Sequence, residues 1–195
     1  EKPVFTGITR GVGGFGFGGG GGSGGPATVS GGTLVADGVT SGSNTYYGFT
    51  ASGALTVAGG NATFDILVVA GGGSGGAAPP GNGSGGGGGG GVAYLPNITL
   101  GAGTYPVTIG AGGAGTPNAD GVNNAGSDSS FATSPNPYYI LAKGGGGGQD
   151  GPGAAGDGGA GGSGGGGIPG WTKTANQPSQ NSHNSDILNY GNDGA

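Results

Sequence analysis

The glycine-rich runs of this chain have a period, because the residues that interrupt them recur at every third position. The same spacing is present in 71–80 and in 110–115. The clearest case is the run 153–165, with interruptions at Ala154, Asp157, Ala160 and Ser163, and with two of its three rows glycine from Gly156 onward. Three is the repeat of the polyproline II helix, which rises by about 3.1 Å per residue. One row of side chains would then point outward, while the two bare rows touch neighbouring helices.

Glycine accounts for 61 of the 195 residues, which gives such helices a way to associate. A polyproline II helix has no internal hydrogen bonds, so its N–H and C=O groups can bond to adjacent helices wherever no Cβ intervenes. We therefore expect a bundle of polyglycine II helices. The uninterrupted run Gly85 to Gly91 is predicted to be its central helix, with the period-three segments around it. The predicted bundle core contains Gly85, Gly88, Gly91, Gly146, Gly159 and Gly162.

Disorder, a collagen triple helix and irregular glycine loops are the alternatives to this bundle. Glycine tracts often behave as flexible coil, because ordering a glycine costs more backbone entropy than ordering any other residue. Collagen requires one glycine per triplet over long stretches, together with abundant proline. Here the runs are short, two of the three rows are glycine, and the prolines lie at the ends of runs. These features favour the polyglycine II bundle.

Short strands are predicted outside the glycine runs, and helical spacing of apolar residues is absent. The turn 59–61 is predicted to close a hairpin between two of these strands, and 101–103 is predicted to close another. The fold class that follows is all-β plus coil, with small antiparallel sheets or a sandwich, a polyglycine II bundle and no α-helix. The predicted strands lie near 33–36, 45–50, 54–57, 62–70, 92–100 and 104–109.

The N-terminal segment is predicted to be a strand that carries Val4, Phe5 and Ile8 and is donated to the sheet of another subunit. The predicted organisation places this strand and a glycine-rich arm in 1–27, and a β-strand domain in 28–70. The polyglycine II bundle then occupies 71–167, with an inserted hairpin at 92–109 and a loop at 116–143. A polar tail completes the chain at 168–195.

Charge and composition exclude several classes of partner. The four basic and nine acidic residues give a net charge of −5 without forming a patch, which argues against a nucleic-acid ligand. Cysteine is absent, so neither disulfides nor thiolate metal sites can form. No apolar stretch approaches the ~20 residues of a membrane span, so membrane insertion is not expected.

Motifs that resemble catalytic or cofactor sites lack the context that their chemistry needs. The G-x-G-x-x-G match at 71–76 is followed by two prolines, so no helix can begin there to bind a pyrophosphate. A serine in a G-x-S-x-G context occurs at Ser23, Ser74 and Ser163, but the sole histidine, His183, lies in a polar tail. We therefore expect no enzyme activity, no catalytic residues and no cofactor.

Metal binding is also not expected. One histidine, no cysteine and isolated carboxylates do not make a transition-metal site. Asp120, Asp128 and Asp150 could hold a calcium ion only if their loops came together, and solvated loop aspartates are the preferred interpretation.

Several segments in a fixed order resemble a known family. They are 46–57, 65–70 running into glycine, 103–115, 126–131 and 142–148. Their order resembles the glycine-rich domain of bacteriophage tail and tail-fibre proteins over roughly 30–167. The glycine runs are similar in composition to the polyglycine sandwich in tip adhesins of T-even-like phages. No N-terminal fibre-docking domain is visible, and 171–195 does not match.

The resemblance implies a non-enzymatic structural or adhesion protein of a phage virion, at the virion surface or outside the cell. Its expected partners are further copies of itself, other virion subunits and a host-surface receptor. Tyr138, Tyr139 and Trp171 are the predicted receptor or partner contacts, and the alternative is a hydrophobic plug beneath the bundle. A self-assembling subunit of an extracellular filament or coat is the second hypothesis. Ice binding is a third, although the Thr-rich rows that it needs are not found.

Overall fold

The computed structural model describes residues 5–10, 28–32, 38–77, 83–115, 124–149, 158–167 and 187–191. These residues form eleven strands joined by extended or irregular segments, and the described part of the chain contains no helix. The strands are β1 (Phe5–Arg10), β2 (Thr28–Ser30), β3 (Val39–Ser41), β4 (Asn44–Phe49), β5 (Gly53–Ala58), β6 (Ala62–Val69), β7 (Val92–Leu100), β8 (Gly103–Thr108), β9 (Ser129–Phe131), β10 (Ile140–Ala142) and β11 (Leu188–Tyr190).

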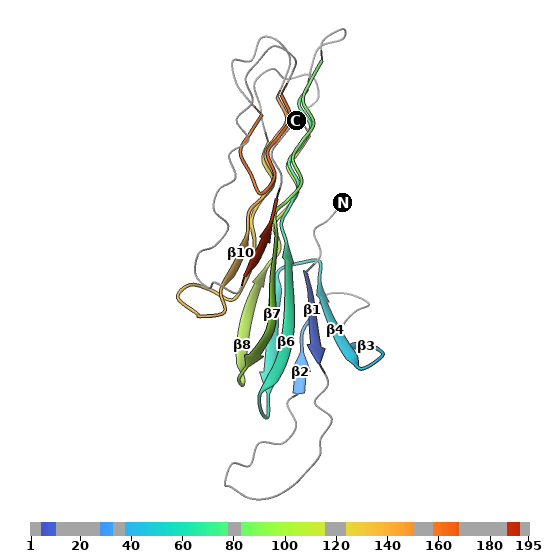
Figure 1. Cartoon of the computed structure of the whole chain (residues 1–195), viewed down its shortest axis with the longest axis vertical. Coiled ribbons are helices and arrows are strands. Elements are labelled where there is room, and N and C mark those ends of the chain that lie inside the picture. The colour runs from blue at the N-terminus through green and yellow to red at the C-terminus, as the bar shows by residue number, and fades with distance from the viewer. Residues whose placement is uncertain are drawn as a thin grey trace, which may run out of the picture.

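The strands form two antiparallel sheets that pack face to face. Sheet A has six strands in the order β11-β7-β6-β1-β4-β3, and sheet B has five in the order β10-β9-β8-β5-β2. The sandwich occupies one end of an elongated molecule, and glycine-rich segments continue from it to the other end (Figure 1). The predicted fold class, all-β plus coil with a sandwich and no α-helix, is confirmed for the described residues.

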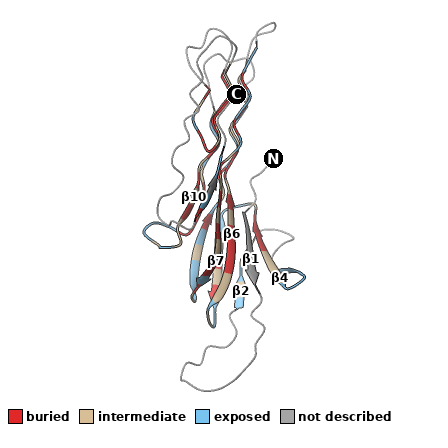
Figure 2. Ribbon diagram, in the orientation of Figure 1, coloured by how far each residue is buried: buried red, intermediate tan, exposed pale blue. Residues whose placement is uncertain are grey.

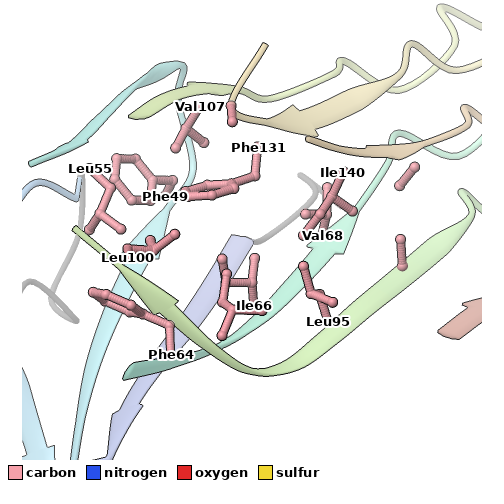
Figure 3. Packing of buried hydrophobic residues seen from close by; sticks show 14 of the residues in the cluster. Phe49, Leu55, Phe64, Ile66, Val68, Leu95, Leu100, Val107, Phe131 and Ile140 are labelled. Carbon is pink, nitrogen blue, oxygen red and sulfur yellow. The ribbon is translucent and has the colours of Figure 1, made fainter. Parts of the chain in front are cut away.

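The hydrophobic core lies between the two sheets, because successive residues of a strand point to opposite faces. Phe64, Ile66 and Val68 of β6 are buried against side chains of sheet B such as Phe131 and Ile140 (Figure 3). Burial of each such side chain stabilises the fold by about 1.5–3 kcal/mol. Figure 2 shows that burial continues from the sandwich into the glycine-rich segments, where few apolar side chains are present.

A β-bulge interrupts the pairing of β6 with β7 opposite Asp65. The register shifts between Phe64 and Ile66, so that Pro96 and Asn97 together oppose one residue of β6. Pro96 has no N–H to donate, and Asn97 takes a left-handed φ of 56°. The Asn97 N–H instead donates a 2.7 Å hydrogen bond to the Asp65 Oδ1, so this buried carboxylate stabilises the bulge.

Five of the six strands predicted from the glycine-poor segments are present, and the sixth, near 33–36, lies outside the described residues. Both predicted hairpins are wrong. The strands β5 and β6 flank the turn 59–61 but belong to different sheets, and so do β7 and β8 around 101–103. The glycine turns carry the chain from one sheet to the other. As a result β6 pairs with β7 in sheet A, and β5 pairs with β8 in sheet B.

The N-terminal strand occupies an interior position in the chain's own sheet. β1 pairs with β4 through Phe5↔Phe49 and with β6 through Ile8↔Asp65. Of the residues predicted for a donated strand, Phe5 and Ile8 lie in β1, and Val4 lies outside the described residues. Donation to another subunit would therefore require this strand to leave a position between two partners of its own chain.

Candidate functional site: the glycine bundle

The glycine bundle grows directly out of paired strands of the sandwich. β6 continues into segment 70–77, and the chain returns through 83–91 into β7. β8 and β9 are joined in the same way through 109–115 and 124–128, and 143–149 continues β10 (Figure 1). A further segment, 158–167, packs among these. The bundle is thus an extension of the sandwich.

Hydrogen bonds between the segments repeat every three residues. The N–H groups of Ala70, Gly73 and Gly76 donate to the carbonyl oxygens of Gly91, Gly88 and Gly85, at 3.0, 2.8 and 2.9 Å. The N–H groups of Gly85, Gly88 and Gly91 donate in turn to the carbonyl oxygens of Gln149, Gly146 and Lys143, at 2.8, 2.7 and 2.7 Å. Bonds to a given neighbour at every third residue are the pattern of laterally bonded three-fold helices. The predicted polyglycine II bundle is confirmed.

The central segment of the bundle is 143–149, and the prediction that 85–91 is central is wrong. Residues 144–149 are all buried, whereas in 85–91 only every third residue, starting at Gly85, is buried. The central segment bonds to four others: Gly145 donates to Gly71, Gly146 donates to Ser163, and Gly126 and Gly88 donate to its carbonyl oxygens. A run of bare glycine can occupy the centre or the periphery equally well, so its sequence does not distinguish the two positions.

The buried glycines are required because a Cβ has no room, and not because of their backbone conformation. A Cβ at Gly85, Gly88, Gly146 or Gly162 would come closer than 3.0 Å to backbone atoms of an adjacent segment. None of these four glycines has a left-handed φ. Of the predicted bundle core, the structure buries Gly85, Gly88, Gly91, Gly146 and Gly162 and half-buries Gly159.

An ion pair joins two segments where the bundle meets the sandwich. The Lys143 Nζ donates to Asp128 Oδ2 at 2.7 Å, and the Gly144 N–H donates to Asp128 Oδ1 at 2.9 Å. The two charged side chains are 34% and 39% exposed, whereas Gly144 is buried. Sequence analysis placed Asp128 among solvated loop aspartates and missed this contact, because nothing in the spacing brings 128 next to 143.

The glycine-rich segments start at the sandwich, and they all finish at the far end of the bundle. There the N–H of Gly76 bonds to Gly85, and the N–H of Gln149 bonds to Gly166 at 3.0 Å. Ser74 donates to Asn124 at 2.9 Å about one turn before that end. The connecting residues 78–82, 116–123 and 150–157 lie outside the described residues, and the ends of the segments fix where each connection starts and finishes.

The predicted contact residues Tyr138 and Tyr139 lie elsewhere. They precede β10, in the connection from β9, on the side of these strands away from the bundle. Both are half-buried, and Tyr138 packs against the hydrophobic core. Burial, with a smaller contribution from Tyr138, raises the pKa of Tyr105. Trp171 lies outside the described residues, so the structure does not bring the three predicted contacts together.

The described residues contain no cluster of side chains typical of a metal site. No group of three or more His, Cys, Asp or Glu side chains lies together in this part of the chain. The buried Ser74 donates through its Oγ to the Asn124 carbonyl oxygen at 3.3 Å, so it joins two segments of the bundle. Residues 71–76 run as an extended segment of the bundle. Within the described ranges no helix is long and apolar enough to span a membrane.

Comparison with known families identifies the chain. The family model described as a glycine-rich domain matches residues 50–195. The chain belongs to this glycine-rich domain family. The match starts at the end of β4 and covers the whole bundle, so the bundle and most of the sandwich belong to the family's domain. No curated protein and no solved structure matches the chain.

Proposed function

We propose that this glycine-rich domain protein is a non-enzymatic structural and adhesion module of a bacteriophage tail or tail fibre. In this role the bundle presents its connecting loops to a receptor on the host surface. The observation that carries the proposal is the common end of the bundle segments. Gly76 bonds to Gly85, Ser74 to Asn124 and Gly159 to Gly147 near that end, so the ends of the connections 78–82, 116–123 and 150–157 lie close together and far from the sandwich.

The bundle is suited to this role because it is rigid and tolerates variation in its connections. Each segment is fixed by backbone hydrogen bonds to two or more neighbours, over about seven residues or about 20 Å. Binding loops that start from a rigid support lose less entropy when they bind a partner. The packing constraint that requires glycine acts on the segments, and the connection 116–123 is accordingly poor in glycine.

The resemblance to phage tail and tail-fibre domains supports the proposed virion setting, and with it a position at the virion surface or in the extracellular space. The partners in this proposal are a host-surface receptor, other virion subunits and further copies of the chain. It requires no cofactor, metal, nucleic acid or membrane insertion. The 9 acidic and 4 basic residues, without a charged patch, agree with a role that does not depend on nucleic acid.

A cell-binding assay with loop replacements tests the proposal. Fluorescently labelled protein is incubated with a panel of whole bacterial cells, and bound fluorescence is measured. Replacing 116–123 or 150–157 by Gly/Ser sequences of equal length is expected to abolish binding without lowering the melting temperature. Thr104→Ser is the control, because Thr104 is an exposed residue of β8 in the sandwich and lies away from this end. Absence of binding to every strain, or binding that survives both loop replacements, would count against the adhesion role.

A self-assembling subunit of an extracellular filament or surface coat is the second candidate function. It is favoured by the two outer strands of sheet A, β3 and β11, each of which has a strand partner on one side only among the described residues. Open strand edges invite pairing with another chain. Negative-stain electron microscopy at micromolar concentration distinguishes the two candidates, since only the filament subunit is expected to form long regular assemblies.

A further inference from the structure

The outer face of sheet A, the face turned away from sheet B, is apolar at the end next to the bundle, whereas its other end carries the paired side chains of Thr63 and Thr99. The register places two rows of large side chains across β6, β7 and β11 on this face. One row is Leu67, Tyr94 and Leu188, and the other is Val69, Val92 and Tyr190. The four members of these rows on β6 and β7 are half-buried, and the β11 residues Leu188 and Tyr190 are 48% and 55% exposed.

The outer face of sheet B shows what an uncovered face of this protein looks like. On β8 the outward residues Thr104, Pro106 and Thr108 are exposed, and Thr56 and Ser130 lie beside them in the register. An antiparallel sheet with one solvated face typically alternates in this way between apolar and polar residues. Sheet A departs from the rule on the same molecule, which indicates that its outer face is covered in the working assembly.

The remaining exposed large apolar side chain among the described residues lies on the same face. Val39 of β3 is 45% exposed and pairs with Tyr46, which the register places beside Ile8 and Asp65. Large apolar side chains are thus present near both edge strands of sheet A, and in the register Thr6 and Gly48 lie between the two groups. Exposed apolar patches of this kind mark interaction sites.

We propose that this face is the interface of a homodimer, in which sheet A of one copy packs on sheet A of a second copy. Two like faces related by a two-fold axis bury the same patch on each subunit, so leucine, valine and tyrosine side chains meet each other. The sheets would pack about 10 Å apart, as sandwich sheets do.

The charge on this face does not oppose a second copy as the partner. The chain has a net charge of −5, which opposes self-association in general. On the described part of this face the acidic residue is Asp65, which is buried and bonded to the Asn97 N–H. The register adds Arg10, opposite Asn44 at the end of β1. The face therefore neither repels a copy of itself nor offers a charge pattern that would select a different partner.

The size of the face agrees with a dimer. Five strand spacings of about 4.8 Å give a width of about 24 Å, and the four inner strands, of six to nine residues, give a length of about 20–30 Å, while β3 and β11 have three residues each. The flat area is roughly 500 Å², and side-chain relief increases it. Two such faces bury about 1,000 Å², which is the lower end for a specific interface, so a weak dimer that dissociates on dilution is expected.

Sedimentation velocity across a concentration series tests the proposal. The full chain is expected to sediment as a dimer at micromolar concentration and to dissociate on dilution. Leu188→Lys is expected to raise the dissociation constant at least tenfold, because it places a charge in the interface. Ser30→Lys is the matched control: Ser30 is an exposed residue of β2, an edge strand of sheet B, and its substitution is expected to leave the dimer unchanged.

A second measurement covers the case in which Leu188→Lys disturbs folding. The chain contains no cysteine, so Tyr190→Cys carries a single spin label. Pulsed dipolar spectroscopy is then expected to give one intermolecular distance, while a label at Ser30→Cys gives a longer one or none.

Three results would overturn the inference. A monomer at all concentrations, with Leu188→Lys less stable, would mean that the chain's own remaining segments cover the face. Species that grow without limit would mean edge-to-edge association of β3 with β11. Equal effects of Leu188→Lys and Ser30→Lys would mean that association does not use this face. None of these results bears on loop-dependent cell binding, so the proposed function is tested separately.

Discussion

The Gly88 N–H donates a 2.7 Å hydrogen bond to the carbonyl oxygen of Gly146, across the contact between a peripheral and the central segment of the bundle. A Cβ on Gly88 would collide with the backbone of Ser163 and Gly164. We expect Gly88→Ala to lower the free energy of unfolding by about 2–4 kcal/mol, from overpacking and the strained hydrogen bond. Urea denaturation followed by circular dichroism measures this change.

The neighbouring Gly89 provides the control for this substitution. A Cβ there would meet only the Ser163 Oγ, at 3.8 Å, and the residue is exposed. Gly89→Ala is expected to change the free energy of unfolding by no more than about 1 kcal/mol, since alanine also restricts the unfolded chain. Equal losses at 88 and 89 would show that glycine is needed here for a reason other than close packing.

The Asp128 carboxylate is predicted to act more through the buried Gly144 N–H than through Lys143. The ion pair is about one-third exposed, and such pairs contribute about 0–1 kcal/mol. Asp128→Asn keeps an acceptor for the Gly144 N–H and is expected to cost less than about 1 kcal/mol. Asp128→Ala leaves that buried N–H without its side-chain acceptor and is expected to cost about 1–3 kcal/mol. Thermal melts of the two variants, run in parallel, would contradict this order if Asn were as costly as Ala.

Asn97 is predicted to be replaceable by glycine but not by valine. Its φ of 56° lies in the left-handed region, which β-branched residues avoid. Asn97→Gly is expected to leave the free energy of unfolding within about 1 kcal/mol, whereas Asn97→Val should lower it by about 1–2 kcal/mol. Denaturant midpoints of both variants provide the measurement, and a valine variant as stable as the glycine variant would contradict the bulge geometry as the cause.

The period of three in the glycine runs was enough to predict the bundle, because only a three-fold helix with bare rows explains both the spacing and the missing side chains. The strand segments 45–50, 62–70 and 92–100 could be predicted because they are rich in β-branched and aromatic residues and lie between glycine-rich turns. The pattern of each element is local, and it is read from neighbouring residues.

Which elements meet could not be predicted in the same way. Gly59 takes a left-handed φ of 81°, as a hairpin turn would require, yet here the turn leads from sheet B to sheet A. The same turn residues can close a hairpin or connect two sheets, and the core contacts of β5 and β6 decide which connection forms. The central place of 143–149 and the contact of Asp128 with Lys143 likewise depend on distant segments.

The interior position of β1 gives the last prediction. This strand has a partner on each side, β4 through Gly7↔Tyr47 and β6 through Gly7↔Ile66, so its removal would separate β3 and β4 from the rest of sheet A. We expect a chain lacking residues 1–10 to lose cooperative unfolding, as measured by near-ultraviolet circular dichroism during a thermal melt. A synthetic peptide of residues 1–10, added in excess, is expected to restore the melt, because the vacated position offers hydrogen bonds to both edges. The same peptide with Ile8→Pro is the control, since proline removes an N–H and is not tolerated between two strands. A truncated chain as stable as the full chain would show that β1 does not complete its own sheet, and would favour its donation to another subunit.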